Sequence, residues 1–173
     1  MHLYHFQIQT NLTTPAVLER VSKLVRDPPG FWQSINEAFD GGLIAAPPFI
    51  GRVAGSEFKC QRNIGYRNSF LPRITGRVES YPGGTEIDVK MYLHPATAVF
   101  MLIWLGGVAF AAIGFFSRGE VAGKAFFPVA MFIFGVVLTL VGFYPEAIKA
   151  RRLLEQQLAP TGAQQARATD ARL

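Results

Sequence analysis

The chain has little of the chemistry that catalytic, metal-binding and disulfide-stabilised proteins require. Among its 173 residues there is one cysteine, Cys60, so no intrachain disulfide can form, which suits a reducing compartment. Of the three histidines, His2 and His5 lie near the N-terminus on a predicted strand, and His94 lies at the membrane entrance with no histidine or cysteine neighbour at metal-ligand spacing. The sequence also lacks a P-loop, a dinucleotide fingerprint and a GxSxG elbow. It therefore predicts no metal, no cofactor and no enzymatic activity.

The charge pattern of a nucleic-acid-binding protein is also missing. The net charge of +5 divides into +2 before the first long apolar run, +1 between the two runs and +2 after the second. A nucleic-acid-binding domain would concentrate its basic residues on one face, so no nucleic-acid partner is expected. The N-terminus has no basic start followed by an apolar run, and no signal peptide is predicted.

Charged residues are absent from two apolar runs, 96–116 and 125–144. Each run has 20 or 21 residues and would be roughly 30 Å long as a helix, enough to cross the hydrocarbon core of a bilayer. The part of the chain before them is too short to wrap both as a soluble core. We expect a transmembrane hairpin over 95–144, with the lipid bilayer as its partner. A single-chain transporter is disfavoured, because neither run holds an ionisable residue.

Basic residues near the two runs predict that both termini are cytoplasmic, since lysine and arginine resist translocation. Five lie on the side of the termini: Arg77, Lys90, Lys149, Arg151 and Arg152. Only two lie in the connecting turn: Arg118 and Lys124. The chain is expected to cross the membrane twice.

Residues 1–94 are expected to form a small cytoplasmic α+β domain with an antiparallel sheet and one or two helices. Alternating apolar and polar residues over 3–9 predict a first strand. A helix should follow with Thr14 as its N-cap and Pro15 in its first turn. A second, short helix is expected over 31–40.

Two β-hairpins are expected between residues 49 and 93. The first turns at Gly55-Ser56, a pair that suits a type II′ turn, and the second turns at Pro82-Gly83. In the second hairpin the apolar faces match when paired residue numbers sum to 165, with Arg77 opposite Asp88 on the solvated face.

Glycines inside the predicted strands, Gly51 and Gly76, are typical of a bulge or a close backbone approach. Small residues in the two apolar runs predict close contact between helices, either within the hairpin, which we favour, or in an oligomer. These residues are Gly106, Gly107, Ala111, Gly114, Gly135 and Gly142.

Beyond the second run, 145–158 is expected to form a juxtamembrane helix and 159–173 a disordered tail, because the tail has almost no large apolar residue. The helix could lie on anionic headgroups or against the sheet, and a basic flank without a further role is the simpler interpretation. Its weak apolar stripe consists of Ala147, Ala150, Leu154 and Leu158.

The segment between the hairpins is the candidate binding site for an anion or a partner. Arginine can hold a phosphate or carboxylate through charge-assisted hydrogen bonds, and hydroxyl and amide groups can assist. The alternative is that these arginines pair with acidic residues of the sheet or touch lipid phosphates. The candidate ligand-binding residues are Arg62, Tyr66, Arg67, Asn68, Ser69 and Arg73.

The same segment carries a resemblance. YRNSFLP at 66–72, Gly76 and Val78, and MYLHP at 91–95 leading into FMLIW at 100–104 resemble a family of small bacterial two-span membrane proteins of unknown function. The similarity covers residues 49–116. It implies a bacterial inner-membrane setting and carries over no catalytic residue.

Two functions follow as hypotheses. The first is a non-catalytic, membrane-anchored module whose cytoplasmic sheet domain binds a protein partner, a lipid headgroup or a small anion in an accessory or regulatory role. The second is an oligomeric effector whose hairpins assemble a pore gated by the cytoplasmic domain. Oligomeric state in mild detergent distinguishes them, because a monomer or dimer has too few helices for a pore.

Overall fold

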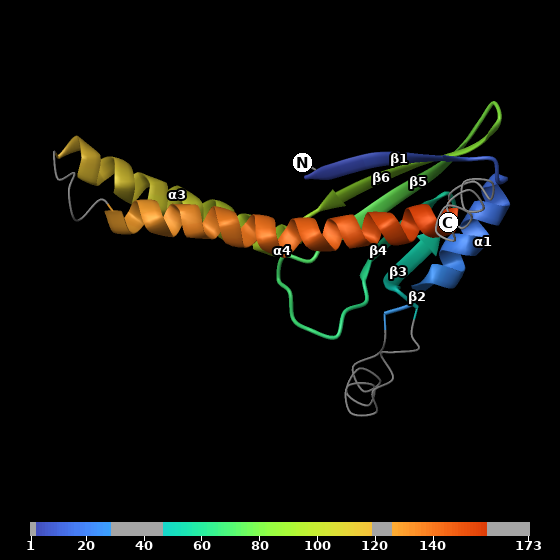
Figure 1. Ribbon diagram of the computed structural model, residues 1–173, viewed down its shortest axis with the longest axis horizontal. Coiled ribbons are helices and arrows are strands. Elements are labelled where there is room, and N and C mark those ends of the chain that lie inside the picture. The colour runs from blue at the N-terminus through green and yellow to red at the C-terminus, as the bar shows by residue number, and fades with distance from the viewer. Residues whose placement is uncertain (1–2, 29–46, 119–125, 159–173) are drawn as a thin grey trace, which may run out of the picture.

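The computed structural model describes residues 3–28, 47–118 and 126–158 of the chain (Figure 1). The expected helix over 31–40 and the expected disordered tail over 159–173 lie outside the described residues. In order, the elements are β1 (Tyr4–Thr10), α1 (Thr14–Leu24), β2 (Val25–Arg26), β3 (Phe49–Ala54), β4 (Glu57–Arg62), β5 (Arg73–Tyr81), β6 (Gly84–Tyr92), α3 (Pro95–Ser117) and α4 (Phe126–Leu158).

The strands form a six-stranded sheet with the order β1-β6-β5-β4-β3-β2. Four neighbouring pairs are antiparallel, but β2 runs parallel to β3. The sheet is therefore mixed, and the prediction of an antiparallel sheet is wrong. Parallel neighbours need a connection of a dozen or more residues, and residues 27–48 separate β2 from β3 in the chain. With only two residues, β2 is too short to leave a periodic pattern in the sequence.

The second hairpin, β5 and β6, has the predicted register. Val78 lies opposite Ile87, and Arg77 lies opposite Asp88. Arg77 nevertheless donates its 2.7 Å hydrogen bond to Glu57 on β4 rather than to Asp88. The alternation of apolar residues thus determines which residues face each other, whereas charged side chains on the solvated face choose among several neighbours.

The turn glycine and the two mid-strand glycines have the conformation and the close contacts that the sequence predicts. Gly55 has φ of +57°, the left-handed value that the first position of a type II′ turn requires. A Cβ atom at Gly51 would lie 2.1 Å from the backbone oxygen of Lys59. At Gly76 it would lie 2.1 Å from the ring of Phe58. Both mid-strand glycines therefore mark close approaches.

Helix α1 begins one residue earlier than predicted. Thr13, not Thr14, is the N-cap residue, and its side chain makes no capping hydrogen bond. The hydroxyl of Thr14 instead lies 3.3 Å from the hydroxyl of Thr85 on β6, so this threonine ties the helix to the sheet. Val17 and Val21 are completely buried against the apolar face of the sheet.

Helix α4 belongs to both the apolar helix pair and the core of the sheet domain. It has 33 residues and is about 50 Å long, so the second apolar run and residues 145–158 form one continuous helix. Its C-terminal half lies with α1 on the apolar face of the sheet (Figure 1), and Ala147, Ala150, Leu154 and Leu158 are at most 1% exposed. The interpretation of this stretch as a basic flank is wrong, because its stripe completes the domain core.

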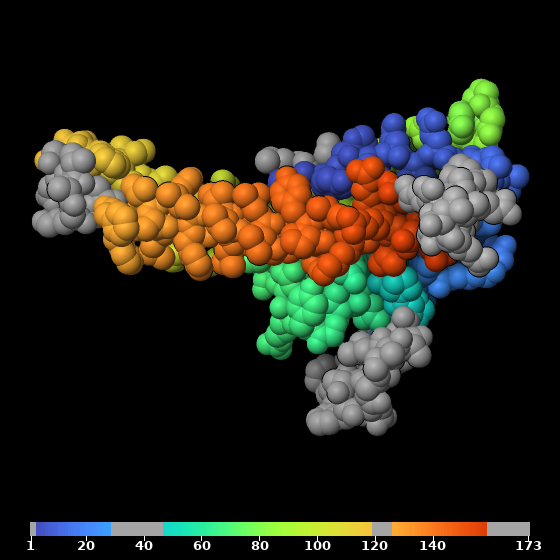
Figure 2. Space-filling model, in the orientation of Figure 1, coloured from blue at the N-terminus to red at the C-terminus, as the bar shows by residue number. Residues whose placement is uncertain are grey.

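Helices α3 and α4 are both long and apolar enough to cross a membrane. They extend side by side away from the sheet domain (Figure 2). The chain changes from strand β6 to helix α3 at His94, which is the N-cap residue of α3. Its ring accepts a hydrogen bond from the N–H of Ala96 in the first turn. Gly135 packs against Leu105, whereas a Cβ atom at Gly106 would meet nothing within 4 Å.

Candidate functional site: the loop and helix junction

The loop that joins β4 to β5, residues 63–72, lies against α4 where the helix leaves the sheet domain (Figure 1). Arg62 ends β4 on the apolar face of the sheet, opposite Phe49, so its side chain points toward α4. The candidate residues are thus presented to a helix that lies more than 70 positions further along the chain. We call this contact region the junction.

A buried carboxylate, Glu146 of α4, is the centre of the junction. It is 3% exposed, and Arg62 forms an ion pair with it. The Tyr66 hydroxyl donates a 2.7 Å hydrogen bond to it, and the Lys149 ammonium donates one of 3.0 Å. Three donors from three positions of the chain therefore satisfy one carboxylate.

These partners change the ionisation of the cluster. Burial alone would raise the pKa of Glu146, but hydrogen bonds from Tyr66 and Lys149, with the charges of Arg62 and Lys149, lower it below its usual value of 4.5. The hydrogen bond to Glu146 raises the pKa of Tyr66. At neutral pH the carboxylate is ionised and the phenol is protonated, so the network keeps its donors and acceptor in place.

Asn68 supports the helix where its hydrogen-bond ladder is interrupted. Pro145 has no N–H, so the carbonyl of Val141 receives no helical hydrogen bond. The Asn68 amide donates a 2.8 Å hydrogen bond to the next carbonyl, that of Gly142. Asn68 also accepts a 2.9 Å hydrogen bond from the N–H of Phe70, which shapes the loop. The Asn68 side chain therefore stabilises both the loop and its contact with α4.

Ser69 and Phe70 attach the loop to both long helices. The backbone oxygen of Ser69 accepts a 3.0 Å hydrogen bond from the Thr97 hydroxyl in the first turn of α3. The ring of Phe70 rests on Gly142, where a Cβ atom would lie 2.8 Å from Cβ of Phe70. This glycine is needed for the loop to approach α4 closely.

Arg67 differs from its neighbours because it is exposed and has no hydrogen-bond or ion-pair partner among the described residues. It lines an open groove of about 480 Å³ between loop residues 66–70 and the α4 segment from Leu138 to Lys149. We call this the junction groove. Along α4, the residues that line the groove are first apolar and exposed, at Leu138 and Val141, and then charged, at Lys149.

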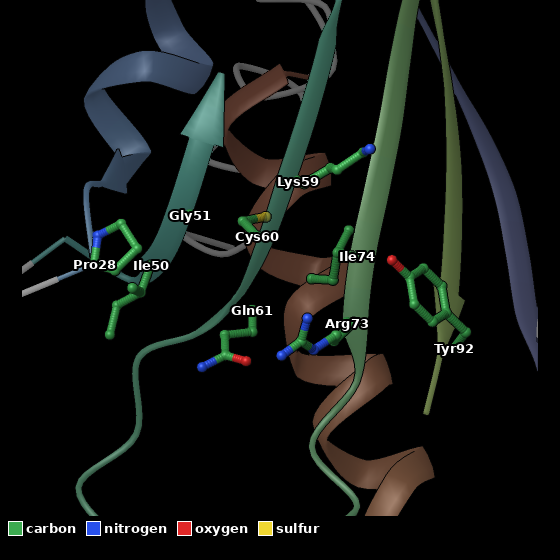
Figure 3. Close-up of a pocket in the computed structure, with 9 residues that line it drawn as sticks. All are labelled: Pro28, Ile50, Gly51, Lys59, Cys60, Gln61, Arg73, Ile74 and Tyr92. Carbon is green, nitrogen blue, oxygen red and sulfur yellow. The ribbon is translucent and has the colours of Figure 1, made fainter. Parts of the chain in front are cut away.

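The structure does not bring Arg73 to the junction. Arg73 begins β5 on the opposite face of the sheet and lines a separate hollow of about 330 Å³ with Gln61 and Tyr92 (Figure 3). Cys60 borders the same hollow, but burial raises the pKa of its thiol to about 12. The thiol is therefore protonated at neutral pH and is not an activated nucleophile.

The sequence points to the loop but not to its main partners, Glu146 and Lys149. The available signal was a carboxylate placed directly after Pro145, at the end of an uncharged run of 20 residues, at the start of the weak apolar stripe. Only the three-dimensional contact shows that this carboxylate faces Arg62, 84 residues away. Within 3–28, 47–118 and 126–158, no group of three or more histidine, cysteine or acidic residues is arranged to hold a metal ion.

Comparisons with protein-family models, curated proteins and solved structures give no match to the chain. The resemblance over residues 49–116 therefore stays a prediction.

Proposed function

We propose that this chain is a non-catalytic, membrane-anchored binding module of a bacterial inner membrane, with both termini in the cytoplasm. The observation that carries the proposal is the continuity of α4, half of which is apolar and exposed while the other half is part of the core of the sheet domain. A shared rigid helix holds the sheet domain at a constant height and orientation above the bilayer. Such an arrangement suits a protein that presents a binding surface at the membrane.

The loop of residues 66–70 is the proposed binding surface. Loops held by a rigid scaffold concentrate binding residues, and this loop is fastened to both long helices through Asn68 and Ser69. Arg67 is left exposed beside these fastenings, where it can reach a protein partner, a lipid headgroup or a small anion. The charged residues around Glu146 act as the support that holds the loop in place.

Cysteine labelling tests the proposed orientation. Because Cys60 is buried, it is first replaced by alanine, and exposed Ser56 or Ser117 is then changed to cysteine. In spheroplasts, a membrane-impermeant maleimide should modify the cysteine at 117 directly and the one at 56 only after permeabilisation. The reverse pattern would overturn the orientation.

Photocrosslinking tests the binding surface. A photoreactive phenylalanine analogue is placed at Arg67 and, as a matched control, at exposed Lys59 on the other face of the sheet. The proposal predicts a discrete protein or lipid adduct from position 67. Adducts from position 59 alone would move the binding surface to the open face of the sheet.

The second candidate function is the oligomeric pore. It is favoured by the first helix, in which Gly106, Gly107 and Gly114 have no described atom within 4 Å of an added Cβ and so leave a small-residue surface for another copy. The hydroxyls of Thr97 and Thr139, however, donate to backbone carbonyls rather than lining a path. A ring of several copies in mild detergent would support the pore, and a monomer or dimer would exclude it.

A further inference from the structure

We propose that the junction groove binds an anionic phospholipid, with the phosphate between Arg67 and Lys149 and the upper part of an acyl chain along Leu138 and Val141. The inference rests on the proposed membrane placement. It goes beyond that proposal by naming one ligand, a phospholipid that carries net negative charge, and one site for it.

The charges at the groove favour an anion. Arg67, Lys149 and Glu146 line the groove, and the charge of Glu146 is neutralised by its ion pair with Arg62. Together these four groups leave an excess of two positive charges, those of Arg67 and Lys149. Glu146 is already satisfied by its ion pair with Arg62 and its hydrogen bond from Tyr66. Arg67 and the half-exposed ammonium of Lys149 can therefore turn toward a phosphate without leaving a buried carboxylate unpaired.

The apolar part of the groove distinguishes a lipid from a free anion. Leu138 and Val141 are 43% and 65% exposed, and they precede Lys149 on the same helix. The helix rises about 16 Å from Leu138 to Lys149, about half the thickness of a bilayer hydrocarbon core. Apolar and cationic surfaces thus follow each other along one groove in the order of an acyl chain and its headgroup. A soluble phosphate would use only the cationic end.

Tyr66 lies where a phospholipid changes from polar to apolar. The residue is 56% exposed, and its hydroxyl donates a hydrogen bond to Glu146. Tyrosine is enriched at membrane interfaces because one end of the side chain is apolar and the other polar. The ring can therefore cover the glycerol region of the lipid while the hydroxyl keeps the loop in position.

The test uses the full chain in nanodiscs made from dioleoyl phosphatidylcholine with a titrated fraction of dioleoyl phosphatidylglycerol. Lipid that remains bound after gentle detergent extraction is identified by native mass spectrometry. We expect preferential retention of phosphatidylglycerol by the wild-type chain. A basic residue near the surface contributes about a fivefold increase in affinity, so Arg67→Ala should weaken retention about fivefold and Arg67→Ala/Lys149→Ala about 25-fold.

Matched variants separate a site from general electrostatic attraction. Arg67→Lys keeps the charge and should retain most of the preference. Arg152→Ala removes another exposed cation, one on α4 that does not line the groove, and it should change retention less than twofold. Thermal unfolding of each variant by circular dichroism shows that the sheet domain is intact. Equal losses in Arg152→Ala and Arg67→Ala would overturn the site.

Competition separates the two possible sources of the phosphate. The soluble headgroup glycerophosphoglycerol and inorganic phosphate are each added to chain that retains phosphatidylglycerol. Displacement at concentrations similar to those of the intact lipid would mean that the apolar half contributes nothing, and the lipid assignment would be wrong. Lipid retention in nanodiscs does not depend on how the chain is oriented in the cell. The lipid experiment and the cysteine labelling can therefore fail independently.

Discussion

Replacing Arg62 by methionine tests whether the buried ion pair with Glu146 holds the loop to α4. The side chain of Arg62 is 20% exposed and that of Glu146 is 4% exposed, so the carboxylate would lose its guanidinium partner where water cannot replace it fully. Removing one partner of a buried pair typically destabilises a protein by about 3–5 kcal/mol. Tyr66 and Lys149 still donate to Glu146, which favours the lower end of this range.

The expected loss can be measured as a shift in thermal unfolding. For a chain of this size each kcal/mol corresponds to about 2–4 °C, so Arg62→Met should lower Tm by roughly 10 °C in mild detergent, followed by circular dichroism of the sheet. Lys23→Met is the matched control, because Lys23 pairs with Glu19 at the surface of α1 and both side chains are largely exposed. No measurable shift is expected from this control.

A double variant shows whether the cost comes from the unpaired charge or from lost packing. Arg62→Met/Glu146→Leu replaces both charges with apolar groups, and such replacements are often neutral or stabilising. The buried Nε–H of Arg62 has no partner among the described residues, and both variants remove this unsatisfied donor, so they differ only in the carboxylate of Glu146. We expect the double variant to recover most of the Tm lost by Arg62→Met. A Tm decrease below about 3 °C in the single variant would refute the reasoning.

Three further predictions follow from particular contacts. Because the folded-state pKa of Glu146 is lowered, its stabilising contribution is complete above pH 4.5 and is lost as the pH falls through the folded value, so the Tm difference between wild type and Glu146→Gln should be largest near neutral pH. A difference that does not shrink in acid would contradict this assignment. Gly76→Ala should destabilise the sheet by about 1–3 kcal/mol in chemical denaturation, because the new methyl group would overlap the ring of Phe58, whereas Gly106→Ala should not. Cys60 should resist maleimide in the folded chain and react once the domain is unfolded, since its thiol is buried with a pKa of about 12; rapid native-state labelling would show that β4 opens.

The junction shows how a basic loop can support a helix and still leave one basic residue exposed for the binding role that we propose. Three side chains of the junction contact α4 and hold the loop against it: Arg62, Tyr66 and Asn68. The side chain of Arg67 is exposed to solvent instead. A substitution at Asn68 should therefore act through stability, and one at Arg67 should act through binding. The sequence left open whether the loop is a site or architecture, and these two substitutions distinguish the alternatives.

Local signals in the sequence were enough for several elements. The two apolar helices follow from the length of their uncharged runs, and the hairpin register follows from apolar alternation together with the Pro82-Gly83 turn. Both signals act between residues that are close in the sequence, where geometry is determined by helical or strand periodicity and by turn type. The extended length of α4 was less evident, because its stripe beyond residue 145 is weak.

Long-range pairing was decided only by the tertiary structure. β1 lies beside β6, 74 or more residues later in the chain, and β2 joins β3 in parallel without any periodic signal of its own. The burial of Ala147 and Leu154 and the meeting of Arg62 with Glu146 likewise depend on how α4 crosses the sheet. Apart from β2, the described helices, strands and apolar runs are indicated by the sequence, because those properties are local. The contacts between these segments, and hence the position of the junction, depend on how they bury one common apolar face. Periodicity does not indicate which segments will pack together on that face.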